Sequence, residues 1–251
     1  MINLVKLIKP AALTSALALM SIPQTAVAQQ VYSGTFTALN NSGVSGSTTL
    51  TLGSGPSMQG ACTTASCSLN VQIQATGLEA GQMHMGHIHG LVDANNMPVA
   101  SHTPTIAQDT DHDGYVELAE GLTTYGPVQV PFGNVDPNLT SSINFNQTFN
   151  LLDPSTYAPG FNIFTLLGPN LDELNLREIV LHGMTVPAGA GAGTPGEVDG
   201  TGGFKDLLPV ASAELHLGAV PEPSTWAMML LGFAGIGLAV RRGKSALPQL
   251  A

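Results

Sequence analysis

Leu69-Asn70-Val71-Gln72-Ile73-Gln74-Ala75 is the stretch that decides the fold, because apolar and polar residues alternate along it without a break. Successive side chains of a β-strand point to opposite faces of a sheet, so this pattern predicts a strand with one buried and one solvated face. Comparable β-prone runs occupy residues 31–39, 47–52, 128–132, 143–151, 179–182 and 211–217. Short strands between Gly, Pro and Asn turns predict an all-β protein, a single antiparallel sandwich or barrel.

Two segments of the body are not expected to be strands. Asp172 to Arg177 could form one short helix, and the glycine-rich residues 188–203 are expected to form a long loop inside the domain. The body, residues 29–219, is long enough for one domain with a proper core.

The N-terminal residues 1–28 have the organisation of a secretory signal peptide. Lys6 and Lys9 supply the positive charge, residues 11–20 a short apolar stretch, and Ala26-Val27-Ala28 a small-residue cleavage site. We therefore expect the mature protein to start near Gln29, outside the cytoplasm.

Charge is distributed unevenly along the chain. The formal net charge is −10, but between Gln29 and Val220 only Arg177 and Lys205 oppose 16 acidic residues, which gives −14 for the body. An acidic surface repels nucleic acid and anionic lipid, so both are poor partner candidates and no nucleic acid is expected. This excess of acidic residues suits an exported protein that binds cations.

Cys62 and Cys67 are the only cysteines of the chain. In an exported protein the expected state is a disulfide, here closing a small loop. A metal-binding cysteine pair is the alternative, but no histidine neighbours it in sequence, which favours the structural role.

Residues 109–120 fit the twelve-residue calcium loop. The liganding positions hold Asp109, Asp111, Asp113, Glu117 and Glu120, with glycine at position 6 and the backbone carbonyl of Tyr115 at position 7. Pro104 before the loop, and Gly121 and Gly126 after it, do not allow the two full helices of an EF-hand. We expect a lone, structural calcium loop, and a solvated acidic turn is the alternative.

Histidines carry the main functional signal. His87 and His89 lie at i and i+2, which on a strand places both imidazoles on one face about 7 Å apart. Two nitrogens at that spacing can reach one metal ion, and neutral imidazole suits copper or zinc. Ile88 would then face the core, whereas His84, His112 and His216 are interpreted as surface or turn histidines.

The C-terminal residues 220–244 resemble the PEP-CTERM sorting signal. They contain Val220-Pro221-Glu222-Pro223, an apolar run over residues 226–240, and Arg241-Arg242-Gly243-Lys244. The resemblance implies a short membrane helix, an inner-membrane intermediate, removal of the signal by an exosortase, and delivery to the cell surface or beyond. A plain single-pass anchor is the alternative, since basic residues mark the cytoplasmic side.

The histidine runs, taken in order, resemble the copper/zinc superoxide dismutase family. The matching positions are His87 and His89, His102 in His-Thr-Pro, and His182 in Ile-Val-Leu-His. The resemblance implies a Greek-key β-sandwich, copper held by these four catalytic histidines, and Lys205 in place of a guiding arginine. The zinc subsite of that family looks lost, so zinc is not expected. The runs Gly34-Thr35-Phe36 and Gly77-Leu78 also resemble the CHRD domain.

Two classes of function follow from these features. One is a copper-only, superoxide dismutase-like oxidoreductase. The other is a non-enzymatic, CHRD-like surface or extracellular-matrix protein, stabilised by calcium and in contact with matrix polysaccharide. A hydrolase finds no support, because no G-x-S-x-G pattern is present.

Overall fold

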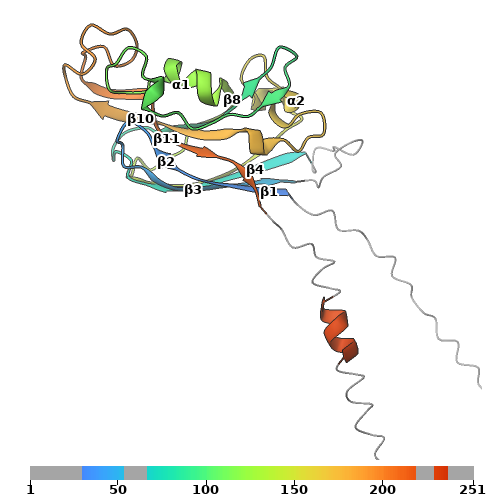
Figure 1. Ribbon diagram of the computed structural model, residues 1–251. Coiled ribbons are helices and arrows are strands. Elements are labelled where there is room, and N and C mark those ends of the chain that lie inside the picture. The colour runs from blue at the N-terminus through green and yellow to red at the C-terminus, as the bar shows by residue number, and fades with distance from the viewer. Residues whose placement is uncertain (1–29, 54–66, 219–228, 237–251) are drawn as a thin grey trace, which may run out of the picture.

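The structure, a computed structural model, describes residues 30–53, 67–218 and 229–236. Within the first two ranges ten strands form two five-stranded antiparallel sheets packed as a β-sandwich (Figure 1). The first sheet has the order β12 (His216–Leu217), β1 (Gln30–Thr35), β3 (Ser45–Leu52), β4 (Ser68–Thr76) and β9 (Ser142–Asn150). The second has the order β2 (Thr37–Ala38), β11 (Gly203–Glu214), β10 (Glu178–Val186), β5 (Met85–His89) and β8 (Val128–Asn134).

The all-β prediction is confirmed, and every predicted β-prone run overlaps a strand. The glycine-rich residues 188–203 form turns up to the start of β11. The predicted helix at Asp172 to Arg177 is wrong in extent, because only a 3₁₀ turn, η3 (Leu174–Leu176), forms there. Further 3₁₀ turns are η1 (Ile106–Gln108) and η2 (Pro154–Thr156), and β6 (Leu91–Val92) pairs with β7 (Pro98–Val99).

The core lies between the two sheets. Leu50, Val71 and Ile73 face it from the first sheet, and Ile88 and Leu181 from the second, all fully buried. The predicted inward orientation of Ile88 is therefore confirmed. Alternation then places the neighbours of these residues on the outer faces of the sandwich.

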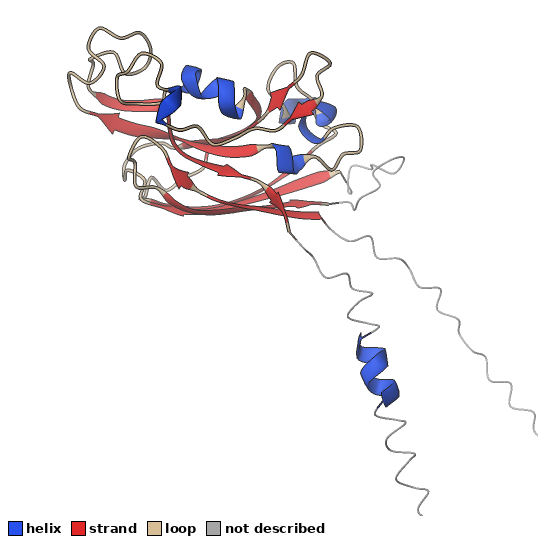
Figure 2. Cartoon of the chain, viewed as in Figure 1, coloured by secondary structure: helices blue, strands red, loops and turns tan. Residues whose placement is uncertain are grey.

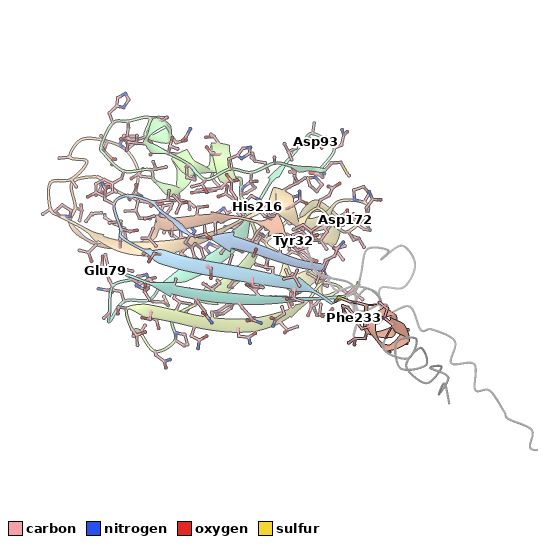
Figure 3. All side chains as sticks on the ribbon, turned by 60° about the horizontal axis from the view of Figure 1, so that its bottom comes forward. Tyr32, Glu79, Asp93, Asp172, His216 and Phe233 are labelled. Atoms are coloured by element: carbon pink, nitrogen blue, oxygen red, sulfur yellow. The ribbon has the colours of Figure 1, made fainter. Side chains whose placement is uncertain are left out.

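The outer face of the first sheet is built from uncharged polar side chains. On β3, β4 and the edge strand β9 these outward residues form what we call the amide face, which consists of Ser45, Ser47, Thr49, Thr51, Ser68, Asn70, Gln72, Gln74, Thr76, Ser142, Asn144, Asn146, Thr148 and Asn150. Figure 3 turns this layer toward the viewer. In contrast, α1 (Leu118–Tyr125) and long connections cover the outer face of the second sheet (Figure 2).

Neither α1 nor α2 (Ile163–Leu167) was predicted from the sequence. Gly121 lies inside α1, where a Cβ atom would approach the Tyr125 ring to 2.3 Å, so the glycine makes room for that buried ring. Gly126 ends the helix with φ of 82°. The expectation that these glycines prevent two full helices holds, but one short helix does follow the acidic loop.

Several predictions concern residues outside the described ranges, namely the signal peptide (1–28), Cys62 and most of residues 220–244. Cys67 is disulfide-bonded and buried beside β4. Residues 229–236 form a helix, and none of the helices among the described residues is long and apolar enough to cross a membrane.

Candidate metal centre

Three histidines from two neighbouring strands meet on the covered face of the second sheet. His87 and His89 belong to β5 and His182 to β10, and these strands pair antiparallel with His87 opposite Val180. Ile88 and Leu181 point into the core, so the histidines point the other way. The strand register shifts next to each of these histidines, which changes the direction of their side chains. The shifts lie beside His87 and His89 in the β5–β8 pairing and around His182 in the β10–β11 pairing.

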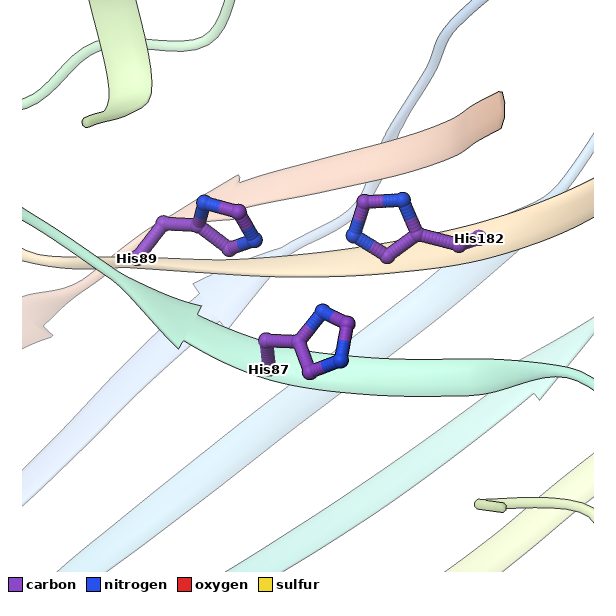
Figure 4. A group of neighbouring side chains, drawn as sticks. All are labelled: His87, His89 and His182. Atoms are coloured by element: carbon purple, nitrogen blue, oxygen red, sulfur yellow. The ribbon is translucent and has the colours of Figure 1, made fainter. Parts of the chain in front are cut away.

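The three rings face one another closely (Figure 4). The ring centroids of His87 and His182 are 4.9 Å apart, and His89 lies 5.6 Å from each. One ring nitrogen of each histidine lies within 4.8 Å of the corresponding nitrogens of the other two. Two nitrogens bound to one ion at the usual distance of about 2 Å are at most about 4 Å apart, so small movements of the rings would bring all three within reach of one ion.

Hydrogen bonds fix two of the rings. The Nδ1 atom of His89 lies 2.8 Å from the Gly126 carbonyl oxygen, and that of His182 lies 2.7 Å from the Leu207 carbonyl oxygen. A carbonyl oxygen only accepts, so both Nδ1 atoms must carry the hydrogen and both Nε2 atoms keep a free lone pair. This is the arrangement in which an outer hydrogen bond orients a metal-binding imidazole.

Three other ring nitrogens of the cluster are buried and unsatisfied. Nδ1 of His87, Nε2 of His89 and Nε2 of His182 have no hydrogen-bond partner among the residues that the structure describes. A buried polar atom without a partner costs about 1–3 kcal/mol, so three of them in one place require a physical reason. A shared ion would satisfy all three.

Burial also keeps these imidazoles neutral. His89 and His182 are fully buried and His87 is 6% exposed. Burial lowers the pKa of His87 to about 4 and that of His89 to about 3, and it lowers the pKa of His182 well below the usual value. Each ring therefore offers a lone pair at neutral pH.

Tyr125 closes one side of the histidine cluster. Its ring packs edge-on against His89 with centroids 4.6 Å apart, and its hydroxyl donates to the Leu118 carbonyl at 3.0 Å. Burial raises the pKa of the Tyr125 phenol, which keeps it protonated. Helix α1 thus supplies both the wall of the site and, through Gly126, the hydrogen bond that orients His89.

His102 does not join the other three histidines, so the expected four-histidine site is wrong at this position. Its side chain is 64% exposed and its Nδ1 atom lies 3.4 Å from a Glu214 oxygen. The backbone N–H of His102 donates to the Thr124 carbonyl, which ties this segment to the last turn of α1. Lys205, the expected guiding residue, forms an ion pair of 3.5 Å with Asp199.

His84 is a buried residue that sequence reasoning assigned to the surface. It is fully buried, its Nδ1 lies 3.2 Å from the His182 carbonyl, and its Nε2 lies 3.0 Å from the Glu79 carbonyl. His84 therefore supports the backbone of a cluster histidine. His112 and His216 are exposed, as predicted.

The acidic loop gathers part of the predicted ligand set. Carboxylate oxygens of Asp109, Asp111 and Glu120 lie within 4.8 Å of one another. The Gly114 amide donates to Asp109 at 2.9 Å, so the glycine turns the loop around this carboxylate, and φ of Gly114 is 92°. Glu120 lies in the first turn of α1, which fixes its carboxylate beside the loop.

Two other predicted carboxylates behave differently. Glu117 is buried and turns away, because its carboxylate accepts the backbone N–H of Val198 in the glycine-rich loop. The Oδ1 atom of Asp113 accepts the Tyr115 amide at 2.8 Å, whereas its Oδ2 atom is buried without a partner in the described part of the chain. Burial raises the pKa of Asp113 to about 6. Six ligands therefore do not converge as expected, and Glu117 instead joins the two loops.

Comparison with known protein families identifies the C-terminal segment. Residues 219–243 match the PEP-CTERM protein-sorting motif. The chain is therefore an exported, membrane-processed protein that the exosortase sorting machinery recognises and that reaches the cell surface. The match does not include the β-sandwich, and no curated protein matches the chain.

Proposed function

We propose that this exported β-sandwich protein binds a copper ion through His87, His89 and His182. The observation that carries the proposal is the convergence of three buried, neutral imidazole nitrogens that lack other partners. Imidazole nitrogen suits copper as well as zinc. Among the described residues no carboxylate belongs to this cluster, and a neutral ligand set in a buried site favours the ion with less charge, which points to Cu(I).

The oxidoreductase hypothesis extends this proposal to superoxide dismutase-like activity on a Greek-key scaffold. A bound copper ion would supply one-electron redox chemistry toward superoxide. Gly126 and Leu207 hold the rings of His89 and His182 in place, and His87 is the ligand with exposed surface. Lys205 would have to leave Asp199 to guide an anion, against a body charge of −14.

The second candidate is a non-enzymatic, CHRD-like surface or matrix protein with a calcium-stabilised loop. Two observations favour it: His102, the fourth ligand that the resemblance implies, lies outside the cluster, and the burial of the other three histidines limits the access of a substrate. Calcium would bind at Asp109, Asp111 and Glu120, with Asp113 completing the shell from the same loop.

Metal analysis and a superoxide assay on the copper-loaded protein test the proposal. We expect one copper per wild-type chain, loss of binding in His89→Ala, and unchanged binding in the control His102→Ala. Superoxide turnover in wild type but not in His89→Ala would support the oxidoreductase. Copper bound without turnover would favour the second candidate, and equal copper in all three proteins would overturn the metal proposal.

A further inference from the structure

The strands of the first sheet carry no Asp, Glu, Lys or Arg. Residues 10–78 and 137–152 contain no Asp, Glu, Lys or Arg, and the strands β1, β3, β4 and β9 lie within these ranges. All 16 acidic residues of the body belong to the second sheet or to connections. Roughly a quarter to a third of a typical protein surface is charged, so the amide face departs strongly from that pattern.

The amide face is an ordered array of hydrogen-bonding groups. Thr49, Gln72 and Asn146 lie opposite one another across three strands, and so do Thr51, Asn70 and Thr148. Neighbouring strands are about 4.8 Å apart and outward residues along a strand about 7 Å apart, which gives a regular two-dimensional grid. Each amide side chain offers two donors and one acceptor in that grid.

Contacts within the array hold these side chains in place. The Nδ2 atom of Asn70 donates to Asn146 at 2.8 Å and to Thr148 at 3.0 Å, and Nε2 of Gln72 donates to Asn70 at 3.0 Å. At one end of the face lies a shallow depression of about 450 Å³, lined by Gln74, Thr76, Ser142 and Asn144 among others. Groups that are already ordered lose less conformational entropy when they bind a ligand.

We infer that the amide face binds an uncharged polysaccharide. An anionic polymer would find no cation there, and a cationic one no carboxylate. A second protein copy would be expected to cover apolar and aromatic side chains, which β3, β4 and β9 do not present on the amide face. Sugar hydroxyls pair with amides and hydroxyls without the cost of desolvating a charge. This inference names the chemistry of the proposed matrix partner and does not depend on the histidine cluster.

Affinity electrophoresis of the full chain tests this inference. Native gels would contain dextran, hydroxyethylcellulose, galactomannan or, as the charged comparison, alginate. We expect at least one neutral polymer to retard the wild-type protein and alginate not to retard it. The variant Gln72→Glu/Asn146→Asp replaces two paired amides on β4 and β9 by carboxylates, which removes four N–H donors and adds two charges, so its affinity should fall roughly tenfold or more.

The control is Asn175→Asp, which makes one such amide-to-carboxylate change at an exposed turn before β10 and should bind as the wild type does. Thermal unfolding confirms that the variants are folded. No retardation by any neutral polymer, or equal retardation of wild type and the double variant, would overturn the inference. So would sedimentation showing that the wild type is a dimer that the double variant cannot form.

Discussion

Glu178 provides the most quantitative test of the energetics around the second sheet. It is fully buried on β10, with one carboxylate oxygen accepting from the Ser212 hydroxyl and, at 3.4 Å, from the Thr103 hydroxyl. The other oxygen has no partner within the described residues. Burial raises the pKa of Glu178 from 4.5 to about 7, because water no longer solvates the anion.

The substitution Glu178→Gln removes this ionisation with little change in volume. Between pH 4.5 and about 7 the folded protein keeps a proton that the unfolded chain releases, so the wild type loses stability as pH rises through this range. One pKa unit corresponds to about 1.4 kcal/mol, so the full loss is about 3 kcal/mol. The Gln variant should not show this loss, so the difference in free energy of unfolding between the variant and the wild type should grow by about 3 kcal/mol in favour of the variant from about pH 5 to about pH 8.

Denaturant unfolding followed by circular dichroism across this pH range measures the difference. Asp206→Asn is the control, because it removes one exposed negative charge and reports any general effect of net charge. A free-energy difference between wild type and Glu178→Gln that stays constant with pH would refute the argument that Glu178 ionises in a buried site.

Three further predictions concern the surroundings of the candidate sites. Arg177 is fully buried and donates to the carbonyls of Leu91, Thr165 and Leu166. Arg177→Met should therefore lower the free energy of unfolding in urea by about 3 kcal/mol or more, whereas the control Lys205→Met should not. Tyr125→Phe should lower the free energy of unfolding by about 1 kcal/mol, because the hydrogen bond to Leu118 is lost, but should leave the copper affinity in a chelator competition unchanged. Tyr125→Ala should lower both the free energy of unfolding and the copper affinity, because it also removes the ring that packs against His89. Calcium at about a hundred times its Kd should stabilise the wild type by about 3 kcal/mol in thermal unfolding, and Asp109→Asn should abolish this gain; a gain retained in the variant would contradict a calcium site at the loop.

The sequence was most informative where local periodicity decides the outcome. Alternation in residues 69–75 predicted β4 and its buried face, because a strand has only two faces and one must cover the core. The same rule placed His87 and His89 together and Ile88 in the core. Residue spacing alone was therefore enough for two of the three clustered histidines.

Tertiary contacts decided what periodicity could not. His102 lies in a connection whose course depends on α1, so no local pattern shows that its side chain turns to Glu214. Glu117 matches a calcium-ligand position, but its carboxylate accepts a hydrogen bond from the backbone of the glycine-rich loop instead. Helix α1 was not predicted because glycine disfavours a helix. The structure shows that Gly121 is needed there to make room for the buried ring of Tyr125.

The most direct test of the metal proposal is anomalous diffraction at the copper edge from crystals of the copper-loaded protein. We expect one strong peak about 2 Å from Nδ1 of His87, Nε2 of His89 and Nε2 of His182. A peak beside His102 and Glu214, or no peak between the three histidines at full copper loading, would contradict it.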